Sequence, residues 1–164
     1  TGEIGEVEIS GPNIMLGYLN KPEITAETLI DGYVRTGDAG YLDKDGYLFL
    51  VDRVKDMIIS GGENVFSAEV ESIISLHPSV KDVVVIGIPH AEWGEQVHCI
   101  IIKHDNIEVT EQQVIAHTKA HIAGYKCPKS ITFREKPFPV SGAGKVLKIE
   151  LRKPYWADKG RMVN

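Results

Sequence analysis

Lys145 is the residue whose type and setting best suit chemistry on a phosphate group. It ends a glycine-rich segment, Pro-Val-Ser-Gly-Ala-Gly-Lys, at residues 139–145. A lysine in a flexible loop can bring a compact positive charge to a phosphate. The segment is not a Walker-type phosphate-binding loop, because its glycine spacing differs and Val146 stands where a serine or threonine would hold magnesium. It also lacks the third glycine of a dinucleotide-binding fingerprint.

Two further segments carry residues suited to binding a nucleotide sugar or lining a ligand channel. Asp38 follows Gly37, and a carboxylate in such a turn can accept hydrogen bonds from the two neighbouring hydroxyls of a ribose. An ordinary surface turn is the more common role of Thr-Gly-Asp. Residues 52–64 read Asp-Arg-Val-Lys-Asp-Met-Ile-Ile-Ser-Gly-Gly-Glu-Asn. Their charge cluster is also consistent with a solvated face, and their glycine pair with a simple turn.

The elements in the first third of the chain are short and rich in turns. Residues 6–10 alternate between polar and apolar side chains, which is the period of a half-buried strand. Residues 41–48 place apolar residues on both sides of an Asp-Gly turn, a pattern that predicts a β-hairpin. We therefore predict a small β-rich subdomain over residues 1–52.

Residues 53–164 show a different pattern, in which apolar strands alternate with helices. A capping box that starts at Thr110 predicts one helix, and Ser67 is a candidate cap for an earlier one. Uninterrupted β-branched runs predict strands that are covered on both faces. The expected strands lie at residues 83–86, 99–102 and 130–133, preceded by a short apolar strand at 57–59. The order predicts an α+β domain, a small three-stranded sheet with packed helices.

The composition of the 164-residue chain argues against several classes of protein. Its formal net charge of -5 disfavours nucleic acid as a partner, and no apolar run is long enough to span a bilayer. The cysteines, Cys99 and Cys127, lack metal-ligand spacing, and we expect two simple thiols and no metal site. The sequence opens at Thr1 in the approach to a strand, and we interpret it as cut from a longer protein.

In this order and at these spacings, the three segments resemble the adenylate-forming superfamily of acyl-CoA synthetases, luciferases and peptide-synthetase adenylation domains. The resemblance covers nearly the whole chain. It implies that Asp38 binds the ribose hydroxyls of ATP and that Arg53 also contacts the nucleotide. It further implies that Lys145 is the catalytic lysine of the adenylation half-reaction, where a cation stabilises the charge that grows on the α-phosphate.

The resemblance also assigns a hinge and a channel to the second segment. Lys55 falls on the hinge between a large N-terminal domain and a small C-terminal one. Ser60, Gly61, Gly62 and Glu63 match the loop that lines the pantetheine channel of CoA. A side chain at Gly62 is expected to block that thin ligand arm. Because the two half-reactions need different faces, the small domain is expected to swing about its hinge.

Two domain assignments follow from the resemblance. Residues 1–52 correspond to the end of the large N-terminal domain, and residues 53–164 to the C-terminal mobile domain of AMP-binding enzymes. The family's ATP-phosphate loop, its Mg2+-binding segment and its acyl pocket have no counterpart in this sequence and are expected upstream. We therefore expect the isolated chain to be inactive.

The full-length protein is expected to be a cytoplasmic, AMP-forming acyl-CoA synthetase that uses ATP with Mg2+, a carboxylic acid and CoA. Residues 57–65 are similar to fatty-acyl CoA ligases, although Ile59 stands where luciferases and plant aryl-CoA ligases carry a second lysine. Lys126 and Lys129 are candidates for contacting the CoA phosphates, and plain surface lysines fit equally well. Two alternatives stay open: an adenylation domain that loads a carrier protein, and a non-catalytic binding module with the same fold.

Overall fold

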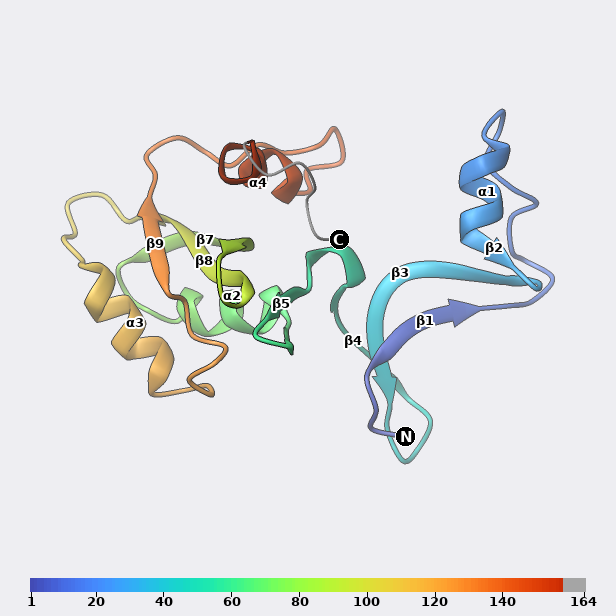
Figure 1. Ribbon diagram of the computed structural model, residues 1–164, viewed down its shortest axis with the longest axis horizontal. Helices are drawn as coiled ribbons and strands as arrows, with labels where there is room; N and C mark the ends of the chain where they lie inside the picture. Colours follow the sequence, from blue (N-terminus) through green and yellow to red (C-terminus); the bar gives the residue numbers. More distant parts are fainter. Residues whose placement is uncertain (158–164) are drawn as a thin grey trace. The chain divides into compact units, whose positions relative to one another are not determined.

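The computed structural model describes residues 1–157 of the chain, which divides into two compact units, Thr1–Lys55 and Asp56–Asn164. We call them unit 1 and unit 2. The division falls three residues beyond the boundary expected from the sequence, after residue 55 instead of residue 52. Figure 1 shows the course of the chain, with unit 1 in blue to cyan and unit 2 in green to red.

Unit 1 is an antiparallel sheet of four strands with one short helix. The strands follow the order β1-β3-β2, and β4 pairs with β3. The bounds are β1 (Gly5–Ile9), α1 (Pro22–Thr28), β2 (Leu29–Ile30), β3 (Tyr33–Leu42) and β4 (Leu48–Arg53). The hairpin predicted for residues 41–48 joins β3 to β4, and the Asp43 carboxylate caps its turn by accepting the backbone N–H groups of Asp45 and Tyr47, each at 2.9 Å. The β-rich character expected for this part is thus present in the structure.

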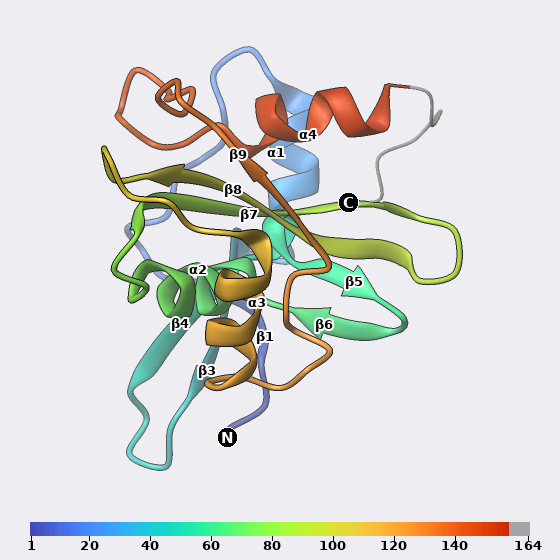
Figure 2. The same cartoon turned by 90° about the vertical axis from the view of Figure 1, so that its left-hand side faces the viewer.

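Unit 2 is a five-stranded sheet with helices packed on it (Figure 2). The strand order is β6-β5-β8-β7, and β9 pairs in parallel with β8. The bounds are β5 (Ile58–Ser60), β6 (Glu63–Val65), α2 (Ser67–Ser75), β7 (Val80–His90), β8 (Gly94–Lys103), α3 (Glu111–Lys119), β9 (Ser130–Phe133) and α4 (Lys148–Trp156). A short 3-10 helix, Val54–Asp56, spans the division between the units.

The α+β class is confirmed, but the expected count of three strands is corrected to five. The three expected strands are β7, β8 and β9. The short strand expected at 57–59 corresponds to β5 and also joins the sheet, because Ser60 pairs with Gly94, the first residue of β8. Gly61 and Gly62 have φ angles of 61° and 87°, which lets the chain turn tightly and add β6 as a hairpin partner.

Both faces of the unit 2 sheet are covered, as the uninterrupted apolar runs predicted. Val83 and Val85 of β7 belong to one apolar cluster, which includes residues of α2 and α3. Val84 and Ile86, which alternate with them, belong to a second cluster with Leu151 of α4. Because side chains alternate along a strand, a run that is apolar at every position needs cover on both sides.

Two helix starts can be compared with the sequence prediction. The capping box of α3 is present, with the Thr110 side chain accepting from the backbone of Gln113 and the Gln113 side chain accepting from the Thr110 backbone. The cap predicted for Ser67 is wrong. Phe66 is the N-cap residue of α2, and Ser67 is already the first helical residue, with a fully buried side chain.

Candidate functional site

In unit 1, Asp38 and Arg53 are brought together across the β3–β4 hairpin. They are direct cross-strand neighbours, and Nη1 of Arg53 lies 3.0 Å from Oδ1 of Asp38. Gly37 precedes Asp38 with a φ of 72°, and Thr36 Oγ1 accepts the backbone N–H of Asp38 at 3.1 Å. The side chains are 28% and 46% exposed, for Asp38 and Arg53 respectively, so the pair is open to a ligand. A carboxylate has two oxygens and several acceptor sites, so this ion pair leaves capacity for vicinal hydroxyls.

Lys55 is exposed in the 3-10 helix Val54–Asp56 and is the last residue of unit 1. The short helix is thus the connection between the two units. A short element that absorbs φ and ψ changes is the usual location of a domain hinge.

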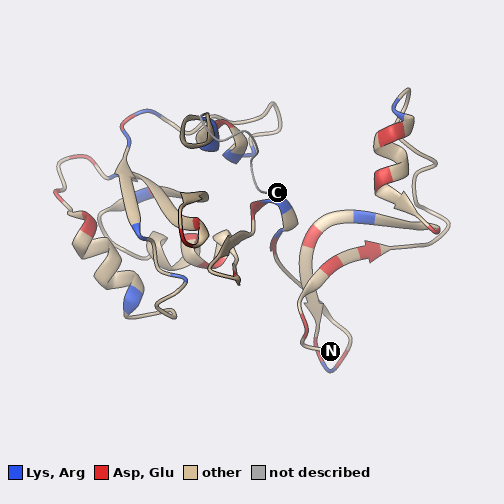
Figure 3. Ribbon diagram, viewed as in Figure 1, with Lys and Arg blue, Asp and Glu red and all other residues tan. Residues whose placement is uncertain are grey.

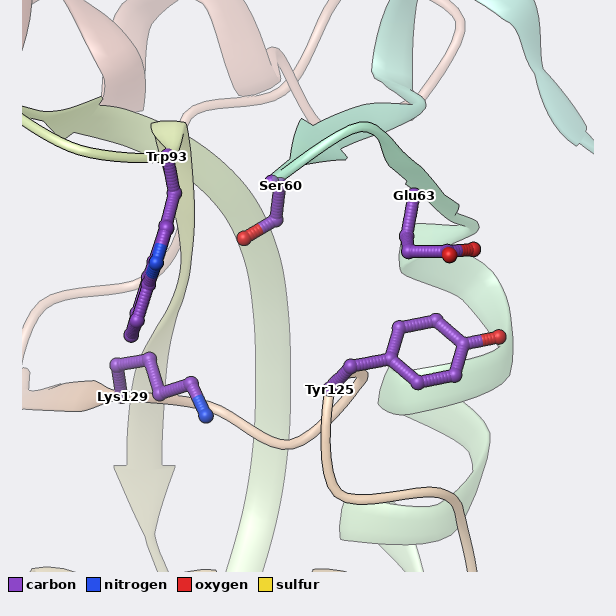
Figure 4. A pocket seen from close by; sticks show the side chains of 6 residues that line it. Ser60, Glu63, Trp93, Tyr125 and Lys129 are labelled. Carbon is purple, nitrogen blue, oxygen red and sulfur yellow. The ribbon is translucent and has the colours of Figure 1, made fainter.

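Unit 2 contains a pocket with a volume of about 210 Å³ at the tip of the β5–β6 hairpin. Figure 4 shows Trp93 and Lys129 on one side, Tyr125 and Glu63 on the other, and Ser60 between them. The pocket is lined by Ser60, Gly61, Glu63, Trp93, Tyr125 and Lys129. Three of the four residues predicted for a ligand channel therefore lie at one site.

Gly62, the fourth predicted channel residue, does not line this pocket. A Cβ added there would meet nothing within 4 Å, whereas its φ of 87° is disfavoured for other residues. In the described chain, glycine is therefore required at this position by the backbone turn. The expected close approach of the pantetheine arm to Gly62 stays a prediction.

Trp93 forms the aromatic wall of the pocket and is held from several directions. Its ring stacks on that of His90, with centroids 4.3 Å apart and an interplanar angle of 16°. The ammonium of Lys129 lies 5.4 Å from the Trp93 ring centroid, a cation–π arrangement. The backbone N–H of Gly61 donates to the carbonyl of Trp93 at 3.0 Å, which joins this wall to the glycine turn.

The two lysines considered for CoA phosphates have different surroundings. Lys126 Nζ donates to both carboxylate oxygens of Glu69, at 2.8 and 2.7 Å. Lys129 is exposed and faces the pocket, with Nζ 3.5 Å from the carbonyl oxygen of Gly124. Lys129 is therefore the better placed of the two for a phosphate at the pocket.

Lys145 lies in a small loop closed by an isolated bridge between Val140 and Val146. Within the loop, the Ser141 N–H donates to the Lys145 carbonyl at 2.8 Å and the Lys145 N–H donates to Ser141 Oγ at 3.2 Å. Gly144 has a φ of 77° and donates its N–H to the Ser141 carbonyl at 2.9 Å. The loop is thus a defined turn that presents an exposed Lys145, which is not among the residues lining the pocket.

Two ionisable side chains of β8, Glu95 and His98, are buried in the sheet of unit 2. Burial lowers the pKa of His98 to about 4, and its two ring nitrogens lie 2.7 Å from Ser130 Oγ and 2.9 Å from the Tyr155 hydroxyl. Burial raises the pKa of Glu95, whereas the hydrogen bond that its carboxylate accepts from the Ile59 N–H at 3.0 Å lowers it. These groups connect β8 with β9, α4 and β5, and they contribute to structure.

Charged side chains of both signs occur on elements of each unit (Figure 3). Within residues 1–157, no group of three or more histidine, cysteine, aspartate or glutamate residues is arranged to hold a metal ion. Among the described helices, none is both long enough and apolar enough to cross a membrane.

Residues 69–145 match the family model of the AMP-binding enzyme C-terminal domain. The chain is 45% identical over 154 residues to a feruloyl-CoA synthase of Amycolatopsis sp, which covers 94% of this chain and 31% of that protein. It is 46% identical over 153 residues to a long-chain-fatty-acid–CoA ligase of Mycobacterium tuberculosis, covering 93% of this chain and 30% of the relative. It is also 40% identical over 163 residues to a fatty acid–[acyl-carrier-protein] ligase of Streptomyces coeruleorubidus, covering 99% of this chain and 31% of that protein.

Among solved structures, the ATP-bound MatB of Rhodopseudomonas palustris superposes with a TM-score of 0.87 at 37% identity, covering 98% of this chain and 32% of that one. The chain thus spans about a third of the length of the proteins it matches. Residues 69–145 thus match the C-terminal domain of AMP-binding enzymes, and the chain has the fold of that part of an adenylate-forming enzyme.

Trp93 and Tyr125 line the pocket although no sequence pattern indicated them. Neither lies in a motif, and they come from the β7–β8 turn and from the segment between α3 and β9. An aromatic next to a glycine or lysine is too common to mark a site. Only the fold brings these residues to the glycine turn.

Proposed function

We propose that this chain is part of an ATP-dependent acyl-CoA ligase that converts a carboxylic acid to acyl-AMP and then to acyl-CoA. The observation that carries the proposal is the pocket at the β5–β6 turn. It combines the predicted channel residues Ser60, Gly61 and Glu63 with an aromatic wall and a lysine. The relatives named as CoA ligases support the acceptor assignment.

In the first half-reaction, the acid's carboxylate attacks the α-phosphate of ATP and pyrophosphate leaves. Asp38 accepts hydrogen bonds from the ribose hydroxyls, and Arg53 contacts the nucleotide. Both side chains can do so because their ion pair is open to solvent. Lys145 neutralises charge that develops on the α-phosphate and the bridging oxygen. Mg2+ would supply further charge neutralisation on the phosphates, and we assign none of the described residues to it.

In the second half-reaction, the CoA thiolate attacks the acyl carbonyl and AMP leaves. We assign the pantetheine arm to the pocket, where Trp93 offers a flat apolar wall and Ser60 a hydrogen-bonding hydroxyl. The ammonium of Lys129 is suited to a CoA phosphate. Lys55 is assigned to the hinge about which the small domain swings. The swing removes the Lys145 loop from the reaction centre and brings this pocket to it.

We propose a fatty acid as the substrate class, on the wording of residues 57–65 and the similarity to fatty-acid ligases. Because one relative is a feruloyl-CoA synthase, an aryl acid is the first substrate to compare with fatty acids in an activity assay. A carrier-protein acceptor remains the second candidate, since one relative is a fatty acid–[acyl-carrier-protein] ligase. Parallel assays of the full-length enzyme with CoA and with a carrier protein separate the two. The cytoplasmic location stays a prediction.

Two lysines three residues apart allow a matched test of the CoA site. In the full-length ligase, Lys129→Ala is expected to raise the KM for CoA about tenfold, equivalent to ~1.4 kcal/mol of binding. Lys126→Ala is the control, because the Lys126 ammonium is paired with Glu69. The rate of acyl-AMP formation should be unchanged in both variants. An unchanged KM for CoA in Lys129→Ala, or equal effects of the two changes, would contradict the assignment.

The isolated 164-residue chain provides a second test. It should catalyse no carboxylate-dependent ATP–pyrophosphate exchange, because none of its described residues is assigned to the acyl group or Mg2+. Exchange above the buffer blank would contradict the proposed division of the active site.

A further inference from the structure

The loop that carries Lys145 continues directly into α4, and the first side chain of α4 reaches into the body of unit 2. That residue, Lys148, has a side chain only 13% exposed. Its Nζ lies 2.7 Å from Oε1 of Glu71 and 2.7 Å from Oγ of Ser67. Both partners are on α2, one helical turn apart. A charge-assisted hydrogen bond therefore ties the stem of the loop to a different helix.

The carboxylate that receives Lys148 is itself attached to the sheet. Oε1 of Glu71 also accepts the backbone N–H of Val85 in β7 at 2.7 Å, so one oxygen connects α4, α2 and β7. The pair lies beside the core residue Cys99. Burial raises the pKa of the Cys99 thiol well above its usual value, the Glu71 carboxylate raises that pKa further, and the Lys148 ammonium lowers it.

The remainder of α4 has contacts of its own with the sheet. Leu151 belongs to the apolar cluster on that face, and Nε1 of Trp156 donates to the carbonyl of Gly87 at 3.2 Å. These contacts hold the middle and the end of the helix. The Lys148 contact holds its first turn, three residues after Lys145. Loss of the Lys148 contact should therefore loosen the loop stem and leave the rest of α4 in place.

The position of the Lys145 ammonium depends on this stem. Lys145 is exposed, and the hydrogen bonds of its loop run within the loop or to its own base, where Leu147 N–H donates to the Pro139 carbonyl at 2.8 Å. A charge that stabilises a transition state must be placed to within roughly 0.5 Å. A displacement of about 1 Å can cost on the order of 10²-fold in rate.

We propose that Lys148 is a positioning residue for the adenylation half-reaction: paired with Glu71, it fixes the stem of residues 140–147 and so aims the Lys145 ammonium. The proposal rests on the proposed function, which gives Lys145 its role. Lys148 touches no substrate and acts through Lys145.

The test compares Lys148→Met with Lys153→Met in the full-length ligase. Lys153 is the control, since it pairs with Glu150 in the same helix at 2.6 Å but is 57% exposed. At saturating ATP, Lys148→Met should slow acyl-AMP formation about tenfold. This loss is smaller than the roughly 10²-fold expected for a displacement of about 1 Å, because the loosened stem should move the Lys145 ammonium by less than about 1 Å. Thioester formation from supplied acyl-AMP should change less than about twofold, and Lys153→Met should change neither rate.

A double variant shows whether Lys148 acts through Lys145. Lys148→Met should slow acyl-AMP formation in the natural background and add nothing in a Lys145→Ala background. Equal slowing of both half-reactions, or equal slowing in both backgrounds, would overturn the proposal. If Lys145→Ala alone leaves adenylation unchanged, the role of Lys145 in the proposed function fails, and the positioning role fails with it.

Hydrogen exchange on the isolated chain gives a readout that needs no activity. Lys148→Met should speed amide exchange in residues 141–147 and leave α3 unchanged. If that variant folds poorly, Glu71→Gln replaces it, because a glutamine oxygen still accepts the Val85 N–H while the charge is lost. Unchanged exchange in residues 141–147 in a folded variant would overturn the positioning role.

Discussion

Unit 1 and unit 2 bury their apolar side chains to very different extents. Unit 2 has apolar clusters on both faces of its sheet, and Ile74, Ile86 and Ile101 are completely buried. Among the residues of unit 1, Ala39 is the one buried hydrophobic side chain, whereas Leu16 and Leu50 are 99% and 62% exposed. Unit 2 therefore has the core of an independent domain, while unit 1 has the surface of a subdomain that needs further polypeptide to cover it.

The strongest test of this contrast is to separate the units. Residues 56–164 alone are expected to unfold in one cooperative thermal transition, because their two apolar clusters are internal to them. Residues 1–55 alone should show no cooperative transition and should bind a hydrophobic dye, because their apolar side chains stay exposed. Calorimetry and dye fluorescence measure both. A cooperative transition from residues 1–55 would remove the distinction.

A pair of identical substitutions sharpens the comparison at single residues. Ile101→Ala in unit 2 should lower the free energy of unfolding by about 2–5 kcal/mol, because it leaves a cavity in a filled core. Ile9→Ala in unit 1 should change it by less than about 0.5 kcal/mol, since Ile9 is 48% exposed. Denaturant unfolding of the 164-residue chain measures both. Similar losses at the two positions would show that unit 1 has a core of its own.

The comparison extends to chemistry, because unit 2 is assigned two roles and unit 1 one. In the proposed full-length ligase, Lys145→Ala should slow acyl-AMP formation by at least about 10²-fold, the effect of losing one transition-state charge stabiliser. Thioester formation from supplied acyl-AMP should be nearly unchanged. Single-turnover assays of each half-reaction measure this, with Lys153→Ala as a control on exposed lysines. Equal slowing of both steps would remove the separate role of Lys145.

A final test concerns the pH dependence of the stability of unit 2, which contains all six histidines of the sequence. Burial lowers the pKa of His98 from 6.5 to about 4, so the unfolded chain binds the proton more readily than the folded one. The contribution to stability is complete above pH 6.5 and is lost as the pH falls towards 4, by roughly 3 kcal/mol in total.

The raised pKa of Glu95 acts in the opposite direction, since the folded state then binds a proton more readily than the unfolded chain as the pH falls. The quantity to measure is therefore the difference between the natural chain and His98→Gln. The pH dependence of unfolding between pH 7 and pH 5 should be weaker in the variant. Identical slopes would show that His98 does not titrate as its burial requires.

Much of the architecture could be predicted from the sequence, because it depends on patterns that extend over only a few residues. The uninterrupted apolar runs predicted β7 and β8 and their cover on both faces, and the Thr110 capping box predicted α3. The Asp-Gly pattern predicted the hairpin that joins β3 to β4, and the pairing of Asp38 with Arg53 across it is a finding of the structure. The count of strands was too low, because the glycine turn at residues 61 and 62 creates a hairpin whose strands have only three residues each.

The composition of the pocket and the partner of each lysine were decided by the tertiary structure. Trp93, Tyr125 and Lys129 reach the glycine turn from segments more than 30 residues away from it. Lys126 pairs with Glu69 across 57 residues, and Lys148 reaches Ser67 across 81. Side-chain type and spacing define what a residue can do locally. Which charge is neutralised and which stays open depends on packing between distant segments, and no local pattern in the sequence encodes that.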